Sequence, residues 1–241
     1  MTTITARFLL NRGRDRLSAE ELDALEQAFD APKTLPPRRT IIERGDEIGV
    51  STFLLEGVMS RHLDDQDGYR QLFGLHIAGD FFDLHALPLR HLDHDVATIT
   101  ECVVATIPRD RGIALLERYP NLAMMMWYAT MLDAAMHREW IFRLGRLSAI
   151  GRVAQFFCET EARLRATGLG DDDAVPLPIN QTDVAEACGL TPVHVNRVLR
   201  TLREEGLLTF RSGTVRIEDR ARLYRRGEFD DRYLYLDKPA A

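Results

Sequence analysis

The spacing of apolar residues changes character twice along the chain. Between residues 15 and 30 a capping serine, Ser18, precedes Leu22, Leu25 and Phe29 on one helical face, which predicts a short amphipathic helix. From residue 36 to residue 110 the pattern consists of short alternating or β-branched segments separated by glycine and acidic turns. Strands are expected over residues 40–42, 52–55, 58–63, 71–77 and 96–107. Several short strands at this spacing predict a small barrel or roll.

Helical periodicity returns after residue 108. A short helix is expected over residues 112–119, and Asn121 is expected to cap a longer one that ends near Leu144. Five apolar residues follow the three-and-four spacing of a helix pair: Leu122, Met125, Ala129, Leu132 and Met136. Others extend around the helix: Met124, Met126, Trp127 and Trp140. One interpretation is that the helix packs only on its own barrel. We favour a homodimer interface along these five residues, because the helix is apolar around more of its circumference than packing on one side requires.

Residues 180–200 have the pattern of two short helices joined by a tight turn. Six apolar residues have the spacing that buries the helices against a third: Val184, Ala185, Cys188, Leu190, Val195 and Val198. Gly189 supplies the turn, and Thr191-Pro192 offers an N-cap followed by proline at the first helical position. A helix over residues 148–166 and a polar loop over residues 167–178 come before it, and a hairpin turning at Ser212-Gly213 comes after it. A helix-turn-helix with a two-stranded wing predicts binding to duplex DNA.

Composition and charge agree with a two-domain DNA-binding protein. The 241 residues are 45% apolar and 28% charged, and the net charge of −6 argues against a chain that coats nucleic acid nonspecifically. Between Arg146 and Arg226, however, 13 arginines face 11 acidic residues, so this segment carries +2. The most apolar run, residues 122–132, is shorter than the roughly 20 residues that span a bilayer, and no signal peptide is evident. We therefore expect a soluble cytoplasmic protein without a membrane partner.

The ordered set of motifs resembles the Crp/Fnr family of bacterial transcription regulators. The residues that carry the resemblance are Arg44-Gly45-Asp46, Leu55-Glu56-Gly57, Ala78-Gly79-Asp80, Thr100-Glu101-Cys102, Gly151-Arg152-Val153-Ala154, Gly189-Leu190-Thr191, Val195-Asn196-Arg197-Val198-Leu199 and Glu205-Gly206-Leu207. The resemblance implies an α+β fold with an N-terminal double-stranded β-helix or jelly-roll of the cyclic-nucleotide-binding type over residues 1–120. A dimerisation helix and hinge over residues 121–147 and a winged helix-turn-helix over residues 148–223 would follow, leaving a tail over residues 224–241 without an assigned role.

The same resemblance implies a homodimeric transcription regulator on an inverted-repeat operator, with RNA polymerase as a further partner. Arg197 is expected to read guanine, because a guanidinium bonds O6 and N7 together; the alternative is a phosphate contact alone. Asn196 and His194 are the next candidates for contacting base edges. Val193 stands where many family members have a base-reading glutamate, and it can contact only a thymine methyl. The residues expected at the DNA backbone are Thr191, Gln181, Arg200, Arg211 and Ser212.

The roll does not have the residues expected for cyclic-nucleotide control. The family's phosphate clamp is a Gly-Glu pair with an Arg-Ser or Arg-Thr pair. Here these positions fall on Gly79-Asp80, followed by Phe81 and Phe82, and on Leu92-Asp93. An aspartate there repels a phosphodiester, although a clamp shifted to Arg90 stays open. The iron–sulfur cluster of other members is excluded, because no cysteine precedes Cys102.

The sequence leaves two other classes of function to consider, a ligand-sensing module and an enzyme. His85, His91 and His94 share one segment with several aspartates, which suits either a zinc site or a solvated polar loop; we predict no metal, because no fixed spacing brings them together. The alternative function is a metal-, haem- or other small-ligand-sensing module whose DNA binding is secondary. The sequence has no nucleophile–base arrangement, phosphate-binding glycine loop or metalloprotease helix, so we expect no enzymatic activity. Cys102, Cys158 and Cys188 are expected to be buried small hydrophobes.

Overall fold

The computed structural model describes residues 3–171 and 174–237. The expectations for residues 1–2, for residues 172–173 of the polar loop and for residues 238–241 of the tail lie outside the described residues. The described chain divides into two compact units. The first contains residues 3–62, 75–134 and 237, and the second contains residues 63–74, 135–171 and 174–236.

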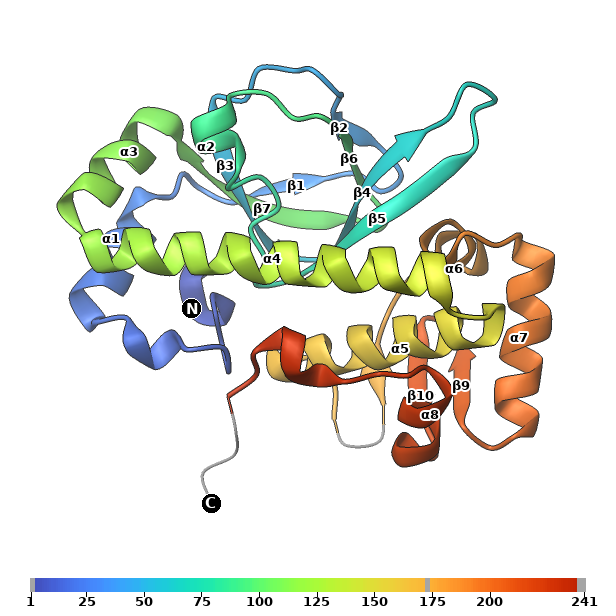
Figure 1. Ribbon diagram of the computed structural model, residues 1–241. Coiled ribbons are helices and arrows are strands. Elements are labelled where there is room, and N and C mark those ends of the chain that lie inside the picture. The colour runs from blue at the N-terminus through green and yellow to red at the C-terminus, as the bar shows by residue number, and fades with distance from the viewer. Residues whose placement is uncertain (1–2, 172–173, 238–241) are drawn as a thin grey trace. The chain divides into compact units, whose positions relative to one another are not determined.

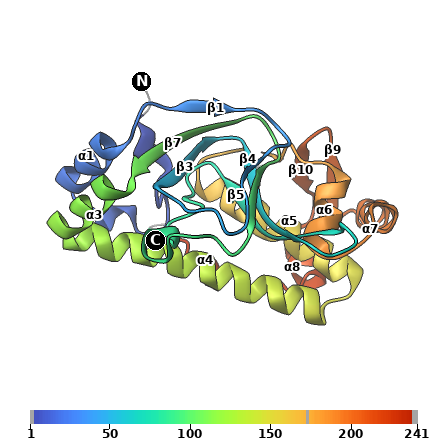
Figure 2. The ribbon, with the colours of Figure 1, turned by 90° about the horizontal axis from the view of Figure 1, so that it is seen from above.

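The first unit is built around a roll of two sheets (Figures 1 and 2). One sheet has the strand order β1-β7-β3, and the other has the order β2-β6-β4-β5. The strands are β1 (Lys33–Leu35), β2 (Thr40–Ile42), β3 (Val50–Glu56), β4 (Val58–Asp64), β5 (Arg70–Ile77), β6 (Asp95–Thr98) and β7 (Cys102–Pro108). The expected roll is therefore confirmed, with two local differences. β1 was not predicted, and the strand expected over residues 96–107 is interrupted at residues 99–101 to give β6 and β7.

Short helices complete the first unit and close its core. They are η1 (Ile4–Arg7), η2 (Arg14–Arg16), α1 (Ala19–Ala28), α2 (Ala86–Leu89) and α3 (Arg109–Arg118). Ser18 caps α1 through a capping box with Glu21, as the sequence predicts. Phe8, Phe53 and Phe81 meet in the core, with ring centroids 4.9 to 6.2 Å apart. Such aromatic pairs contribute more than their buried area alone.

The long helix α4 runs from Pro120 to Arg146 (Figure 1). It begins two residues earlier than a helix capped by Asn121 would, because proline at the first helical position needs no N–H partner. Asn121 is therefore not its cap: it is already the second residue of the helix, and its side-chain amide donates to Arg16 O at 3.0 Å and to Glu21 Oε2 at 3.1 Å. In the part of the chain that the structure describes, no helix has the length and apolarity to cross a membrane.

The second unit contains the predicted winged helix-turn-helix. Its elements are α5 (Ala149–Ala166), β8 (Val175–Pro176), α6 (Gln181–Cys188), α7 (Pro192–Glu204), β9 (Leu208–Arg211), β10 (Thr214–Ile217), α8 (Arg220–Arg226) and η3 (Asp231–Leu234). The wing has three strands in the order β8-β10-β9, because Val175 and Pro176 pair antiparallel with β10. This strand was not predicted from the polar loop that contains it.

The predicted boundaries at residues 120, 147 and 223 differ from the structure. The end of the DNA-binding part at residue 223 cuts through α8, which packs on α5. Residues of the expected tail also belong to the second unit: Tyr233 Oη donates to Glu159 Oε2 at 2.8 Å, and Leu234 is buried. The division between the units lies inside α4, between residues 134 and 135, and not at residues 120 or 147. Helical periodicity does not reveal where one rigid helix changes its packing partners.

Candidate nucleic-acid interface

Helix α7 separates a buried face from an exposed one. Val195, Val198 and Leu202 are at most 6% exposed and fall at the three-and-four spacing that a helix buries. The other face is exposed along its length, at Val193, His194, Asn196, Arg197 and Arg200. The side chains that the sequence assigns to base reading thus share one solvent-facing surface of a single helix.

The N-terminus of α7 is held by local capping. Thr191 has an extended backbone, and its Oγ1 accepts a hydrogen bond from His194 N at 3.3 Å, with Pro192 at the first helical position. Gly189 turns the chain between α6 and α7 at φ 60° and ψ 46°, a left-handed conformation that favours glycine. Asn196 Nδ2 donates to Gln181 Oε1 at 3.2 Å. A residue predicted to read bases therefore contacts one predicted to bind the DNA backbone.

A hollow of about 510 Å³ lies beside the exposed face of α7. It is lined by Thr191, Val193, His194, Arg197, Val198 and Thr201 from the recognition region and by Ser148, Ala149 and Ile150 from the start of α5. The first amides of a helix lack intrahelical partners and favour anions. Sequence reasoning missed this contribution from α5, although Ser148, which caps α5 by accepting from Gly151 N at 3.3 Å, is a recognisable helix-start signal.

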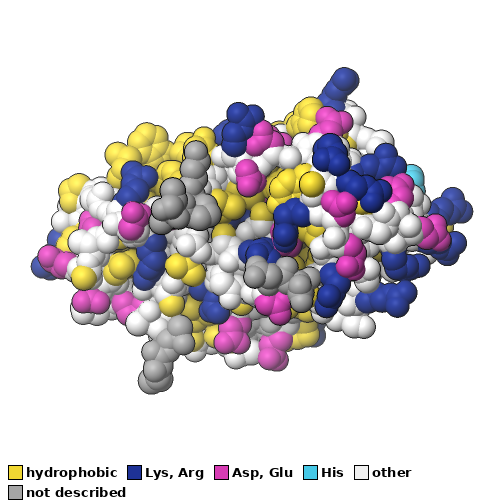
Figure 3. All heavy atoms as spheres, turned by 90° about the horizontal axis from the view of Figure 1, so that it is seen from below, with side chains coloured by type: hydrophobic (Ala, Val, Ile, Leu, Met, Phe, Trp, Pro, Cys, Tyr) yellow, Lys and Arg dark blue, Asp and Glu magenta, His cyan; other side chains and the backbone are white. Residues whose placement is uncertain are grey.

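The wing presents its turn to solvent. Ser212 and Gly213 have φ values of 49° and 70°, the pair of positive angles that a two-residue hairpin turn requires. Arg211 pairs with Thr214 across this turn, and both Arg211 and Ser212 are exposed. Arg side chains gather over the winged unit in Figure 3, with acidic side chains interspersed. Five of the exposed arginines are Arg197, Arg200, Arg203, Arg211 and Arg216.

The predicted dimer seam on α4 is occupied by the protomer's own core. Leu122, Met125 and Leu132 are buried in the core of the first unit, and Ala129 packs against it. Met136 is also only 9% exposed. Placing the interface on these residues was wrong, because the three-and-four spacing identifies a packed face without saying what packs on it. A different face of α4 is exposed and apolar: Met124, Trp127, Met131, Ile141 and Phe142.

The residues predicted for an effector pocket do not form one cluster. Phe82 and Leu92 belong to one part of the core and Phe81 to the other. Asp80 accepts from Ile77 N at 3.0 Å, and the Asp93 side chain is 89% exposed. Gly79 has φ 104°, and a Cβ there would press on Arg7 O. Arg90, the alternative clamp, ends α2 with an exposed side chain. This set does not fit a phosphodiester anion, because it contributes two carboxylates and no inward-facing cation.

The three candidate metal-binding histidines separate into a pair and a single residue. The rings of His85 and His94 have centroids 5.4 Å apart, and His94 Nδ1 lies 2.7 Å from Asp93 Oδ1. His91 is exposed and its Nδ1 lies 3.1 Å from Gly45 O. Over residues 3–171 and 174–237, no group of three or more His, Cys, Asp or Glu side chains could hold a metal ion.

Cys102, Cys158 and Cys188 are all buried free thiols. Burial raises the pKa of Cys188 to about 11, so this thiol stays protonated at neutral pH.

Asp83 gives a pH-dependent contribution to the stability of the first unit. Burial raises its pKa from 3.8 to about 7, although its Oδ1 accepts from Thr52 N at 2.6 Å. Between about pH 4 and 7 the folded chain therefore keeps a proton that the unfolded chain releases, so the free energy of unfolding falls as pH rises through this window. Asp83→Asn retains the acceptor oxygen and cannot ionise.

We expect the unfolding free energy of Asp83→Asn to fall less between pH 5 and pH 8 than that of the wild type, in urea titrations at both values. His85, whose pKa burial lowers to about 4, contributes an opposite slope below about pH 6.5, but it is present in both proteins and cancels in the comparison. Parallel pH profiles for the two proteins would show that Asp83 is ionised in the folded state.

Comparisons with known proteins agree with this geometry. Residues 32–119 match the model of the cyclic nucleotide-binding domain, and residues 151–226 match that of the Crp-like helix-turn-helix domain. The nitrogen fixation regulation protein FixK of Bradyrhizobium diazoefficiens is 32% identical over 171 residues, which is 70% of each chain. The fumarate and nitrate reduction regulatory protein of Escherichia coli K12 is 23% identical over 84% of this chain and 81% of its own.

The solved structure of FixK2 from Bradyrhizobium japonicum has the same fold, with a TM-score of 0.74 at 23% identity, over 88% of this chain and 98% of its own. The fold and the matched domains define a transcription regulator with a helix-turn-helix DNA-binding domain. The chain belongs to the Crp/Fnr family, and the relatives it matches are regulators, not enzymes.

Proposed function

We propose that this protein is a homodimeric transcription regulator that reads an inverted-repeat operator through α7 and is not controlled by cyclic AMP. The proposal is carried by the exposed face of α7. Arg197, Asn196 and His194 share this face, and the opposite face of the helix is apolar and buried. In this binding mode the recognition helix enters the major groove and its first residues contact base edges. Arg197 reads guanine, and Val193, 64% exposed, contacts a thymine methyl.

The backbone contacts lie around this helix. The hollow lined by α7 and the first turn of α5 receives a DNA phosphate, because the first amides of a helix favour an anion. Thr191 and Gln181 hold the backbone at the helix starts, Arg200 reaches phosphate one turn beyond Arg197, and Arg211 and Ser212 contact the neighbouring backbone from the wing.

The homodimer forms along the exposed apolar face of α4. Met124, Trp127 and Met131 are 46 to 59% exposed and fall at the spacing of one helical face. An apolar stripe of this kind on one side of a helix marks an interaction surface, and a second copy offers the matching stripe. Two recognition helices about one helical turn of DNA apart then require a two-fold symmetric operator.

Selection from a random duplex library tests the function directly. The protein is expected to enrich an inverted repeat without added cyclic AMP, and its affinity for that duplex is expected to fall steeply with salt because phosphate contacts release counterions. Enrichment of no sequence would overturn the proposed operator binding. Enrichment only after addition of a metal ion, haem or a cyclic nucleotide would favour the alternative, a ligand-sensing module.

A further inference from the structure

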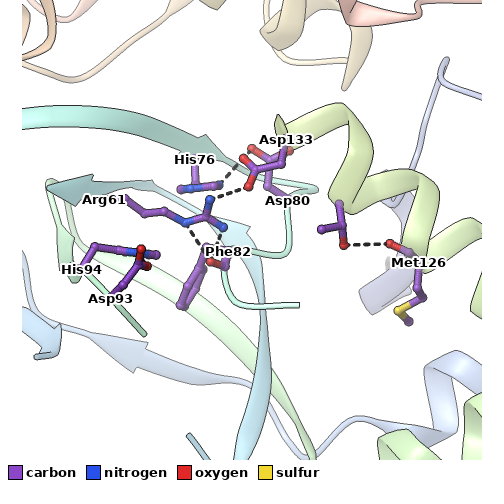
Figure 4. Close-up of polar contacts among 9 residues, drawn as sticks. Arg61, His76, Asp80, Phe82, Asp93, His94, Met126 and Asp133 are labelled. Atoms are coloured by element: carbon purple, nitrogen blue, oxygen red, sulfur yellow. Dashed lines mark hydrogen bonds and ion pairs between the residues drawn. The ribbon is translucent and has the colours of Figure 1, made fainter. Parts of the chain in front are cut away.

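A buried arginine lies inside the roll, bonded to Phe82, one of the residues predicted for an effector pocket. Arg61 on β4 is 2% exposed. Its Nε donates to Phe82 O at 2.9 Å, its Nη2 donates to the same oxygen, and its Nη1 donates to Asp133 Oδ2 at 2.5 Å (Figure 4). A buried cation is tolerated only when it is paired and hydrogen-bonded. The guanidinium is thus bound between one backbone carbonyl of the roll and one carboxylate of α4.

The surroundings place this cation at the expected effector segment. Phe82 follows Gly79-Asp80-Phe81, the segment in which the family resemblance predicts a ligand contact. Figure 4 shows His76 with Asp80 and His94 with Asp93 around Arg61. Burial and then the charge of Arg61 lower the pKa values of His85 and His94. A cation of the chain itself therefore lies next to this segment.

The carboxylate that receives the cation belongs to the helix that carries the proposed interface. Asp133 lies two residues beyond Met131 on α4, and its side chain is 20% exposed. Met124, Trp127 and Met131 are on the same continuous helix. Because a helix rotates as one body, fixing Asp133 to the roll also fixes the direction in which this apolar face points.

We propose that Arg61 acts as a built-in effector, with its guanidinium bound by Phe82 O and Asp133 so that α4 presents its apolar face to a second copy. The inference rests on the proposed homodimer. It implies a binding site of stated chemistry: when the arginine side chain is removed, the space between Phe82 O and Asp133 takes a small planar cation of the guanidinium type, which donates to both oxygens as Arg61 does. Arg61 is then a positioning residue for dimerisation.

The test compares dimer dissociation by analytical ultracentrifugation at a temperature where every variant is folded. Arg61→Ala is expected to raise the dissociation constant at least about tenfold, because the ion pair that joins the roll to α4 is lost. About 10 mM guanidinium chloride, far below denaturing concentrations, is expected to restore dimerisation saturably, whereas equal sodium chloride or urea is not. Asp133→Asn, at a partly exposed position, is expected to weaken dimerisation without any rescue by guanidinium.

Arg111→Ala is the matched control, because it breaks an exposed ion pair of the same unit, with Asp30 at 3.0 Å, and is expected to dimerise as the wild type does. Folded Arg61→Ala and Asp133→Asn variants that dimerise like the wild type would overturn this inference alone. Weakened dimerisation that guanidinium does not change would reduce Arg61 to a packing role. A wild-type chain that stays monomeric would overturn the proposed homodimer and this inference with it.

Discussion

Arg197→Ala is expected to weaken binding to the selected operator by about 1–3 kcal/mol per half-site and to abolish discrimination at one base pair of that half-site. The reason is geometric: Arg197 is exposed on α7, and its planar guanidinium matches guanine O6 and N7 while an alanine contacts neither. Fluorescence anisotropy with the operator and with duplexes substituted at each half-site position measures both effects. Thermal unfolding is expected to be unchanged, because the side chain is not part of the core.

Arg200→Ala is the matched comparison on the same helix. Because Arg200 is proposed to contact phosphate, its replacement by alanine is expected to weaken binding to all duplexes alike. It is also expected to reduce the slope of log affinity against log salt by about one per half-site. If Arg197→Ala instead lowers affinity equally on every sequence, Arg197 contacts phosphate and the assignment of base reading is wrong.

The double substitution Trp127→Glu and Met131→Glu is expected to produce a folded monomer. Both side chains are exposed on α4, at 59% and 46%, so the substitutions leave the protomer's core intact. Charges of one sign facing each other across a two-fold interface repel, and the second half-site is then no longer held at a high effective concentration. Affinity for the full operator is expected to fall about 10²- to 10⁴-fold, towards that of a single half-site.

Leu89→Glu is the control, because Leu89 is an equally exposed apolar residue, at 63%, on α2 of the same unit. It is expected to leave both mass and operator affinity unchanged. A Trp127/Met131 variant that remains dimeric in sedimentation would place the interface elsewhere on the chain.

The DNA-binding unit was predictable because its signals are local. Gly189, Thr191 and Pro192 define the turn and the helix start through the backbone preferences of single residues, and the apolar spacing of Val195 and Val198 gives the orientation of α7. The buried and exposed faces predicted for α7 therefore agree with the structure. Residues 175–176 escaped prediction because a two-residue strand has no periodicity of its own and is defined only by pairing with β10.

The faces of α4 and the interior of the roll depend on contacts that a sequence does not display. Leu122 and Met125 have the same spacing whether they pack on a second copy or on their own core. The pattern alone therefore does not distinguish a dimer interface from the core of the protomer. Arg61 sits in an alternating strand pattern that gives no sign of burial. Its role depends on Asp133, 72 residues away in the chain.

The central claim is that two copies of α7 read two half-sites of one inverted repeat. Equilibrium titration of the selected operator, with the mass of the complex measured in the same sample, tests it most directly. The account predicts two chains per duplex, with about a half-turn insertion of five base pairs between the half-sites weakening binding sharply, because the second recognition helix then faces the wrong side of the DNA. One chain per duplex, or equal affinity with and without the insertion, would contradict it.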